Sequence, residues 1–244
     1  MSRRQETLSY LWYAALWCAC YAFGQLFFRF KFSGKQHVPP TGPVLLVSNH
    51  QSNLDPVLVG VACPRELKYM ARKGLFFFPL GLWIRALGAV PIDQEGSALA
   101  GIRVTLDLLK QNNALLVFPE GSRSPDGKLH KIMPGFCLLA RRSKATIVPL
   151  ALEGAFAALP RGKILVNPHP IALKFGGAIP PAEYSKLSDA QLTELVAKRI
   201  AEQLAAVRQE LAVSPAPLRF WRRKRENLLL ASPVEPAWAS ETAT

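Results

Sequence analysis

Two residues in the segment VSNHQSNLDP, at positions 47–56, have the types and spacing needed for acid–base chemistry. The segment places a histidine, His50, five positions before a carboxylate, Asp55. Such a carboxylate can fold back onto the imidazole, fix its tautomer and stabilise the imidazolium that forms on protonation. The sequence has no Gly-x-Ser-x-Gly elbow or cysteine nucleophile to accompany the histidine. The pattern therefore favours direct attack by a substrate hydroxyl over a covalent enzyme intermediate.

A second polar group, PEGSRSPDGK, begins directly after the apolar run at 114–118. Arg123 carries a planar guanidinium that binds phosphate through two hydrogen bonds. Gly121 permits close approach of the backbone, and Ser122 adds a donor. Glu120 can accept a hydrogen bond from a substrate hydroxyl or orient the guanidinium. By itself this loop is more often a solvated turn, and a lone histidine is more often a capping or core residue, so the functional interpretation depends on both groups together.

Short apolar runs and helical periodicities alternate along the chain and predict the elements that position these groups. Strands are expected at 44–48, 67–71, 88–92, 114–118 and 146–152, with one or two more within 163–175. Helices are expected from about residue 55 and over 97–111, 136–144 and 186–212. The alternation predicts an α/β fold with a mostly parallel central sheet covered by helices. Ligands of such sheets bind beyond the carboxyl ends of the strands, so we expect both polar loops, and the segment DQEGS after 88–92, to face one pocket.

Residues 8–28 are uncharged and rich in Trp, Tyr and Phe, which predicts a membrane-associated helix. Basic residues flank this segment on both sides, so a helix that spans the membrane fits as well as a helix, or a bent pair of helices, that lies in one leaflet. A cleaved signal peptide is a lesser alternative. We therefore expect an anchoring segment (1–35), an α/β domain (36–213) and a basic amphipathic tail (214–244). The tail fits an interfacial helix or a disordered basic segment, and its last residues are expected to be disordered.

The composition indicates an anionic partner. The 244 residues include 30 Lys and Arg against 17 Asp and Glu, a net charge of +13, and 50% are hydrophobic. This combination favours a membrane surface with anionic lipids over nucleic acid. The four cysteines have no metal-ligand or disulfide spacing and the remaining histidines have no partner pattern, so no metal or cofactor is predicted. Reduced cysteines fit a cytoplasmic setting, and we expect the chain at the cytoplasmic face of the inner membrane.

Both polar segments resemble motifs of a known family. NHQSNLD resembles the Asn-His-x-x-x-x-Asp motif of the glycerolipid acyltransferases, and FPEGSRS resembles their Phe-Pro-Glu-Gly-Thr-Arg-Ser motif. The run TIVPLAL resembles their fourth motif. The likeness extends from about Gly42 to Gly154, with the motifs in the same order and separation, and it is closest to the bacterial 1-acyl-sn-glycerol-3-phosphate acyltransferases.

The resemblance implies an activity and a set of site residues. It implies transfer of a fatty acyl group from acyl-CoA or acyl carrier protein to the free hydroxyl of a lysophospholipid, with 1-acyl-sn-glycerol-3-phosphate as the expected acceptor. His50 is then the general base and Asp55 its partner, while Glu120 and Arg123 bind the head group. Lys73, in MARKGLF, lies where the family often has a basic residue facing the phosphate.

Gln94 departs from the family pattern, because the second motif commonly ends in an arginine where this chain has AVPIDQ. A neutral amide cannot supply that charge. Either Lys73, Arg103 or Arg123 binds the anion, or the head group of the acceptor is not a simple phosphate monoester. Another lyso-lipid or glycerol 3-phosphate stays open as the acceptor. From the residues themselves, a non-enzymatic module that binds anionic lipid and a lipid hydrolase that uses water also stay open.

Overall fold

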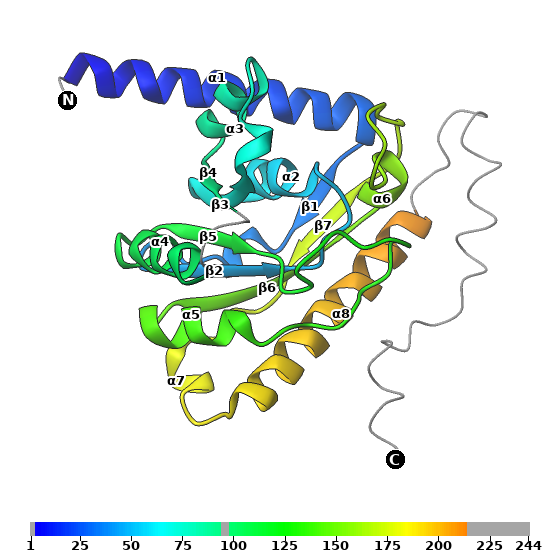
Figure 1. The fold of residues 1–244 in the computed structure, drawn as a ribbon. Coiled ribbons are helices and arrows are strands. Elements are labelled where there is room, and N and C mark those ends of the chain that lie inside the picture. Colours follow the sequence, from blue (N-terminus) through cyan, green and yellow to red (C-terminus); the bar gives the residue numbers. More distant parts are fainter. Residues whose placement is uncertain (1–2, 94–97, 214–244) are drawn as a thin grey trace.

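The centre of the molecule is a seven-stranded sheet, seen in a computed structural model that describes residues 3–93 and 98–213. The strands are β1 (Lys31–Ser33), β2 (Val44–Ser48), β3 (Leu67–Arg72), β4 (Ala89–Ile92), β5 (Ala114–Val117), β6 (Thr146–Glu153) and β7 (Ala172–Phe175). Their order is β1-β7-β6-β2-β5-β3-β4 (Figure 1). All neighbours pair in parallel except β6 and β7, which are antiparallel. The predicted α/β class with a mostly parallel sheet is confirmed.

The helices cover both faces of this sheet. They are α1 (Arg3–Phe28), α2 (Asp55–Ala62), α3 (Leu80–Ala86), α4 (Ala98–Lys110), α5 (Gly135–Ser143), α6 (Ala155–Ala158), α7 (Pro181–Tyr184) and α8 (Asp189–Val213), with short 3-10 turns η1 (Lys35–His37) and η2 (Lys73–Leu75). In Figure 1, α1, α2 and α3 lie above the sheet, and α5 and α8 lie below it. The short helix α3 was not predicted.

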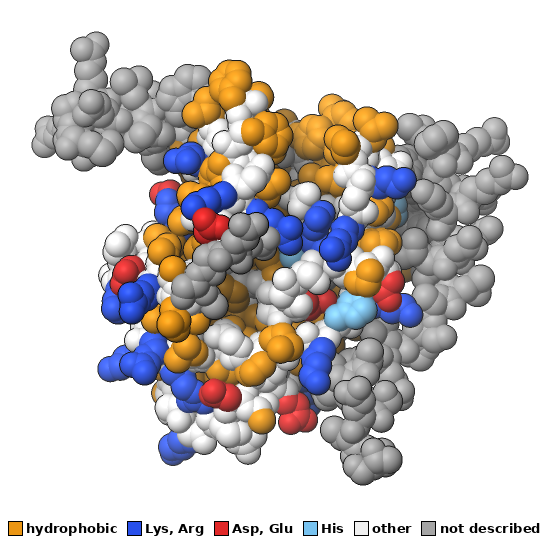
Figure 2. Space-filling view, in the orientation of Figure 1, with side chains coloured by type: hydrophobic (Ala, Val, Ile, Leu, Met, Phe, Trp, Pro, Cys, Tyr) orange, Lys and Arg blue, Asp and Glu red, His pale blue; other side chains and the backbone are white. Residues whose placement is uncertain are grey.

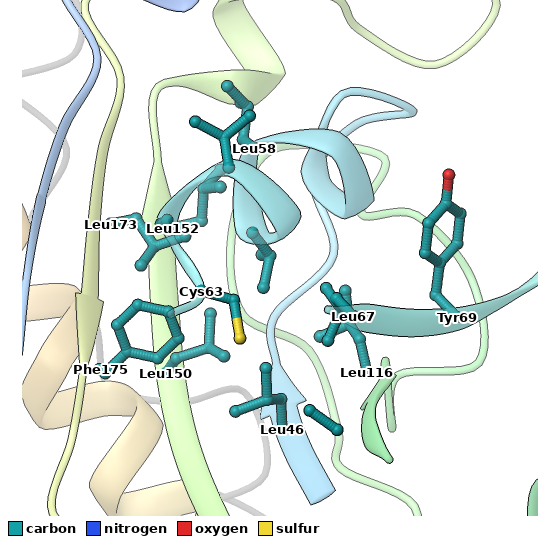
Figure 3. Packing of buried hydrophobic residues seen from close by; sticks show 14 of the residues in the cluster. Leu46, Leu58, Cys63, Leu67, Tyr69, Leu116, Leu150, Leu152, Leu173 and Phe175 are labelled. Carbon is teal, nitrogen blue, oxygen red and sulfur yellow. The ribbon is translucent and has the colours of Figure 1, made fainter. Parts of the chain in front are cut away.

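Strand side chains alternate between two apolar cores, because successive residues point to opposite faces of a sheet. On β2, Leu46 belongs to the core under α1 and α2, whereas Leu45 and Val47 belong to the core that contains α4, α5 and α8. Figure 3 shows the first core, in which Leu150 and Phe175 lie near Leu46 beneath α2. Because β2 is buried on both faces, its sequence is a continuous apolar run and not an alternating one.

Strand β1 was not predicted from the sequence. It lies within the segment 1–35 and pairs with β7, with Phe32 opposite Leu173 in the register. The adjacent backbone is held in the same way, since Lys31 N donates to Ile171 O and Ile171 N donates to Phe28 O. A distant partner therefore creates this strand, and the last residues of the expected anchoring segment belong to the sheet.

Helix α1 contains residues 8–28, for which a spanning and an interfacial placement were both open. Its C-terminal end packs on the first core through Phe28, which is 1% exposed. Over residues 3–93 and 98–213, none of the helices has both the length and the apolar character needed to cross a bilayer. The tail at 214–244 and Gln94 lie outside the described residues.

A substitution at Gly154 tests the tight connection from β6 to α6. Its φ is +95°, and a Cβ at this position would lie 2.1 Å from the carbonyl oxygen of Pro170. We expect Gly154→Ala to lower the free energy of unfolding by about 2 kcal/mol or more, because both the φ angle and the contact are unfavourable. Gly101→Ala is the control, since no described atom lies within 4 Å of its Cβ position in α4. This change should stabilise the protein by about 0.5–1 kcal/mol in urea unfolding. Similar midpoints for the two variants would contradict the prediction.

Candidate active site

The polar loops after β2 and β5 are joined to each other and to β6 at the carboxyl ends of the strands. Asn49 is buried, and its side chain makes both hydrogen bonds with the backbone of Leu152: Nδ2 donates to the carbonyl and Oδ1 accepts from N–H, each at 2.9 Å. The backbone N–H of Ser124 donates to the carbonyl of His50 at 2.7 Å. The predicted convergence of the two loops is present in the structure.

His50 and Asp55 form a hydrogen-bonded pair. Nδ1 of His50 lies 2.8 Å from Oδ2 of Asp55. The same oxygen accepts the backbone N–H groups of Gln51 at 2.6 Å and Ser52 at 2.8 Å. Asp55 is 0% exposed, and its other oxygen, Oδ1, is buried without a hydrogen-bond partner among the described residues. With Nδ1 directed at the carboxylate, Nε2 is the ring nitrogen left to accept a proton.

The imidazole of His50 stacks on the ring of Phe118. The two centroids are 3.8 Å apart and the planes differ by 13°. The stacking covers one face of the imidazole, while 17% of the His50 side chain remains exposed. Phe118 was not predicted as a site residue. The sequence offered little indication of this contact, because Phe118 is the last residue of an apolar run typical of a buried strand.

Glu120 joins the two loops through its carboxylate. Oε1 accepts the backbone N–H of His50 at 2.7 Å, and Oε2 accepts the backbone N–H of His130 at 2.9 Å. Burial raises the pKa of Glu120, and the two backbone hydrogen bonds act in the opposite direction. Glu120 thus has a structural function that the sequence did not predict. Its contact with the substrate stays a prediction.

Arg123 is half-buried within electrostatic reach of the His50–Asp55 pair. Its pKa is lowered mainly by burial and then by the positive charges of Arg161 and Arg72, while the carboxylate of Asp55 raises it. The two neighbouring arginines were not among the predicted site residues. Arg72 ends β3, and Arg161 follows α6, so neither lies in one of the two polar motifs.

The remaining predicted residues lie around this centre. Gly121 has a φ of +74°, the left-handed region that glycine adopts without strain, and Ser122 beside it is exposed. Lys73 begins η2, and its Nζ lies 2.7 Å from a carboxylate oxygen of Asp93. Binding of phosphate by Lys73 stays a prediction. Within the described residues, no cluster of three or more His, Cys, Asp or Glu side chains is placed to hold a metal ion.

The bridge made by Glu120 can be tested by Glu120→Gln. In either orientation the new amide group must direct its own N–H₂ at a backbone N–H, so one buried donor loses its acceptor. We expect the free energy of unfolding to fall by about 1–3 kcal/mol in urea denaturation. Glu183→Gln, at an exposed position of α7, should change it by less than about 0.5 kcal/mol. Equal stabilities for the two variants would show that the bridge does not matter.

Comparison with known proteins supports the resemblance carried by the two motifs. A sequence model of the acyltransferase family matches residues 29–153. The chain is 31% identical over 195 residues to 1-acyl-sn-glycerol-3-phosphate acyltransferase from Streptococcus pneumoniae, covering 77% of this chain and 70% of that one. It is 28% identical over 179 residues to the Bacillus subtilis protein of the same name, covering 70% of this chain and 86% of that one.

The fold also has a solved counterpart. The crystal structure of the 1-acyl-sn-glycerophosphate acyltransferase PlsC from Thermotoga maritima matches with a TM-score of 0.72 and 24% identity, covering 89% of this chain and 86% of that chain. The structural likeness concerns the arrangement of strands and helices, while the family match includes both polar motifs. The chain therefore belongs to the acyltransferase family of enzymes.

Proposed function

We propose that this enzyme transfers a fatty acyl group from acyl-CoA or acyl carrier protein to the free hydroxyl of 1-acyl-sn-glycerol-3-phosphate, giving phosphatidic acid. One observation supports the proposal: Asp55 holds the imidazole of His50 through a 2.8 Å hydrogen bond, and the charge of the same carboxylate acts on the half-buried Arg123. The S. pneumoniae and B. subtilis relatives are named for this acceptor, which supports the choice among lyso-lipids.

In the proposed reaction, Nε2 of His50 takes the proton of the acceptor hydroxyl as its oxygen attacks the thioester carbonyl. The carboxylate of Asp55 stabilises the imidazolium that results. Collapse of the tetrahedral intermediate breaks the carbon–sulfur bond, and the imidazolium returns the proton to the departing thiolate. The oxyanion needs N–H donors during this step, and we expect the backbone of the loop after Phe118 to supply them. No covalent acyl-enzyme forms.

Arg123 supports a phosphate-bearing acceptor. Its guanidinium makes no hydrogen bond or ion pair with any other described residue. Glu120, three residues earlier in the chain, forms no ion pair with it, and both carboxylate oxygens of Glu120 accept backbone N–H groups instead. A half-buried guanidinium without a partner gains most from an anion with several acceptor oxygens, and a phosphate monoester is such an anion.

One side of the molecule supports binding at a membrane. Exposed apolar side chains gather over α1 and α3, with Lys and Arg side chains in a band beneath them (Figure 2). Leu82 and Trp83 on α3 are 62% and 55% exposed, and Phe78, just before α3, is 84% exposed. Apolar side chains bordered by cations suit the boundary of an anionic bilayer. We propose that this face lies on the cytoplasmic side of the inner membrane, where lipid acceptors and acyl thioesters meet.

The role of His50 as general base is tested by measuring acyl transfer from labelled acyl-CoA to lysophosphatidate. We expect His50→Ala and Asp55→Asn each to lower kcat by about 100- to 10,000-fold. The first change removes the base, and the second removes the carboxylate that orients the base and stabilises its protonated form. The KM for lysophosphatidate should change by less than about threefold, since neither side chain is proposed to bind the phosphate. His37→Ala, in η1, is the control and should keep the wild-type rate. Equal transfer by His50→Ala and wild type ends the assignment, and release of free fatty acid instead of phosphatidic acid indicates a hydrolase.

The apolar face is tested by sedimentation with anionic vesicles. Replacing Phe78 and Leu82 together by serine removes two exposed apolar side chains, and burial of each contributes about 1.5–3 kcal/mol. We expect the vesicle affinity to fall at least about tenfold. Leu138→Ser is the control, because this leucine is 41% exposed on α5 across the sheet from α1 and α3. Unchanged binding of the double variant would place the membrane contact elsewhere.

A further inference from the structure

The segment between α6 and β7 is attached to the loop that carries the proposed base. The hydroxyl of Ser52 donates to the carbonyl of Leu159 at 2.8 Å. The backbone N–H of Asn167 donates to the carbonyl of Ala158 at 2.7 Å, which closes residues 159–167 into a compact loop. Arg161 is therefore two residues beyond a point of direct contact with the β2–α2 loop. Its position beside the site follows from this attachment.

Arg161, Arg123 and Arg72 form a cluster of three guanidiniums, two from loops and one from the end of β3. The charges of Arg161 and Arg72 both act on Arg123. None of the three makes a hydrogen bond or ion pair with another residue in the described part of the chain. The carboxylate of Asp55 also acts on Arg123 but forms no ion pair with it, and its oxygen Oδ2 is bonded to His50 and two backbone N–H groups. Like charges gathered in this way become favourable when an anion binds among them.

The charge of this cluster suits a phosphate monoester. Three guanidiniums and the carboxylate of Asp55, the acidic group whose charge acts on Arg123, carry a net charge of about +2. A phosphate monoester carries about −1.5 to −2 near neutral pH, with three strong acceptor oxygens. A carboxylate or a phosphodiester carries a single negative charge and leaves part of the cluster unpaired. Charge matching thus favours an acceptor that ends in a monoester phosphate.

The tip of the same loop is apolar and exposed. Ile164 and Leu165 are 92% and 87% exposed, and the charged Lys163 beside them is also exposed. Figure 1 shows this loop, which follows α6, near the C-terminal end of α1. Two apolar side chains beside cations fit the layer where lipid head groups meet acyl chains. Arg161 therefore lies in the chain between the attachment at Leu159 and this exposed apolar tip.

We propose that Arg161 binds the head-group phosphate of the acceptor together with Arg123 and Arg72. This inference rests on the proposed function and adds a binding residue to it. Arg161 supplies positive charge that Gln94 cannot supply. Because the phosphate neither forms nor breaks a bond in acyl transfer, we expect this contact to be about equally strong before and during the reaction. Its loss then raises KM and leaves kcat nearly unchanged.

The experiment compares Arg161→Met with Lys163→Met, a matched loss of one charge from the same exposed loop. Acyl transfer is measured in neutral-detergent micelles with 1-acyl-sn-glycerol-3-phosphate and with monoacylglycerol, which lacks the phosphate. For Arg161→Met we expect KM for the phosphate-bearing acceptor to rise about tenfold or more, with kcat within about twofold. Transfer to monoacylglycerol should not change, and Lys163→Met should behave as wild type. An unchanged KM, an equal loss with both acceptors, or an equal effect of Lys163→Met overturns the inference.

A binding measurement separates this inference from the proposed reaction. Both lipids are titrated by calorimetry into His50→Ala protein, with and without the Arg161→Met change. If the phosphate-bearing lipid binds more tightly and Arg161→Met removes that preference, the role of Arg161 holds even if the wild type transfers no acyl group. If the preference persists in Arg161→Met, the inference is wrong while the proposed function stands. If neither protein prefers the phosphate-bearing lipid, both the phosphate site and the role of Arg161 are wrong.

Discussion

The hydrogen bonds accepted by one oxygen of Asp55 hold the site together. This oxygen receives the ring of His50 and the backbone N–H groups of Gln51 and Ser52, all within 2.8 Å. One buried carboxylate therefore shapes the loop after β2 and also orients the imidazole. The orientation of the base and the conformation of its loop cannot change separately, because they share an acceptor. The three donors replace lost hydration at this one oxygen, while the other oxygen of Asp55 is buried without a partner among the described residues.

A second buried carboxylate, Glu120, has a different function in the same site. It spans the gap between the two loops by accepting one N–H from each side, at His50 and His130. Glu120 is three residues from Arg123, yet these backbone contacts direct its oxygens away from an ion pair. The guanidinium is left without a carboxylate partner, together with Arg72 and Arg161. The site is thus acidic in its supporting contacts and cationic on the side proposed to face the substrate.

The arrangement of apolar and charged side chains agrees with a lipid acceptor. The apolar face over α1 and α3 lies above the band of cations in Figure 2, and the loop with Ile164 and Leu165 adds apolar side chains close to Arg161. On this arrangement a lysophospholipid keeps its acyl chain in the bilayer while its phosphate contacts the arginines. The free hydroxyl then lies between the bilayer and His50, so the acceptor reacts without leaving the membrane.

The sequence by itself determined the contacts that are local. His50 and Asp55 are five positions apart, so a single loop brings them together, and the apolar runs of β2 and β5 are buried on both faces of the sheet whichever strands lie beside them. The tertiary structure decided the rest. Strand β1 exists because β7 supplies its partner, Glu120 reaches the backbone of His50 across 70 positions, and Arg161 joins Arg123 through the attachment of Leu159 to Ser52. Such contacts depend on strand order and loop path, which side-chain spacing along one segment does not specify.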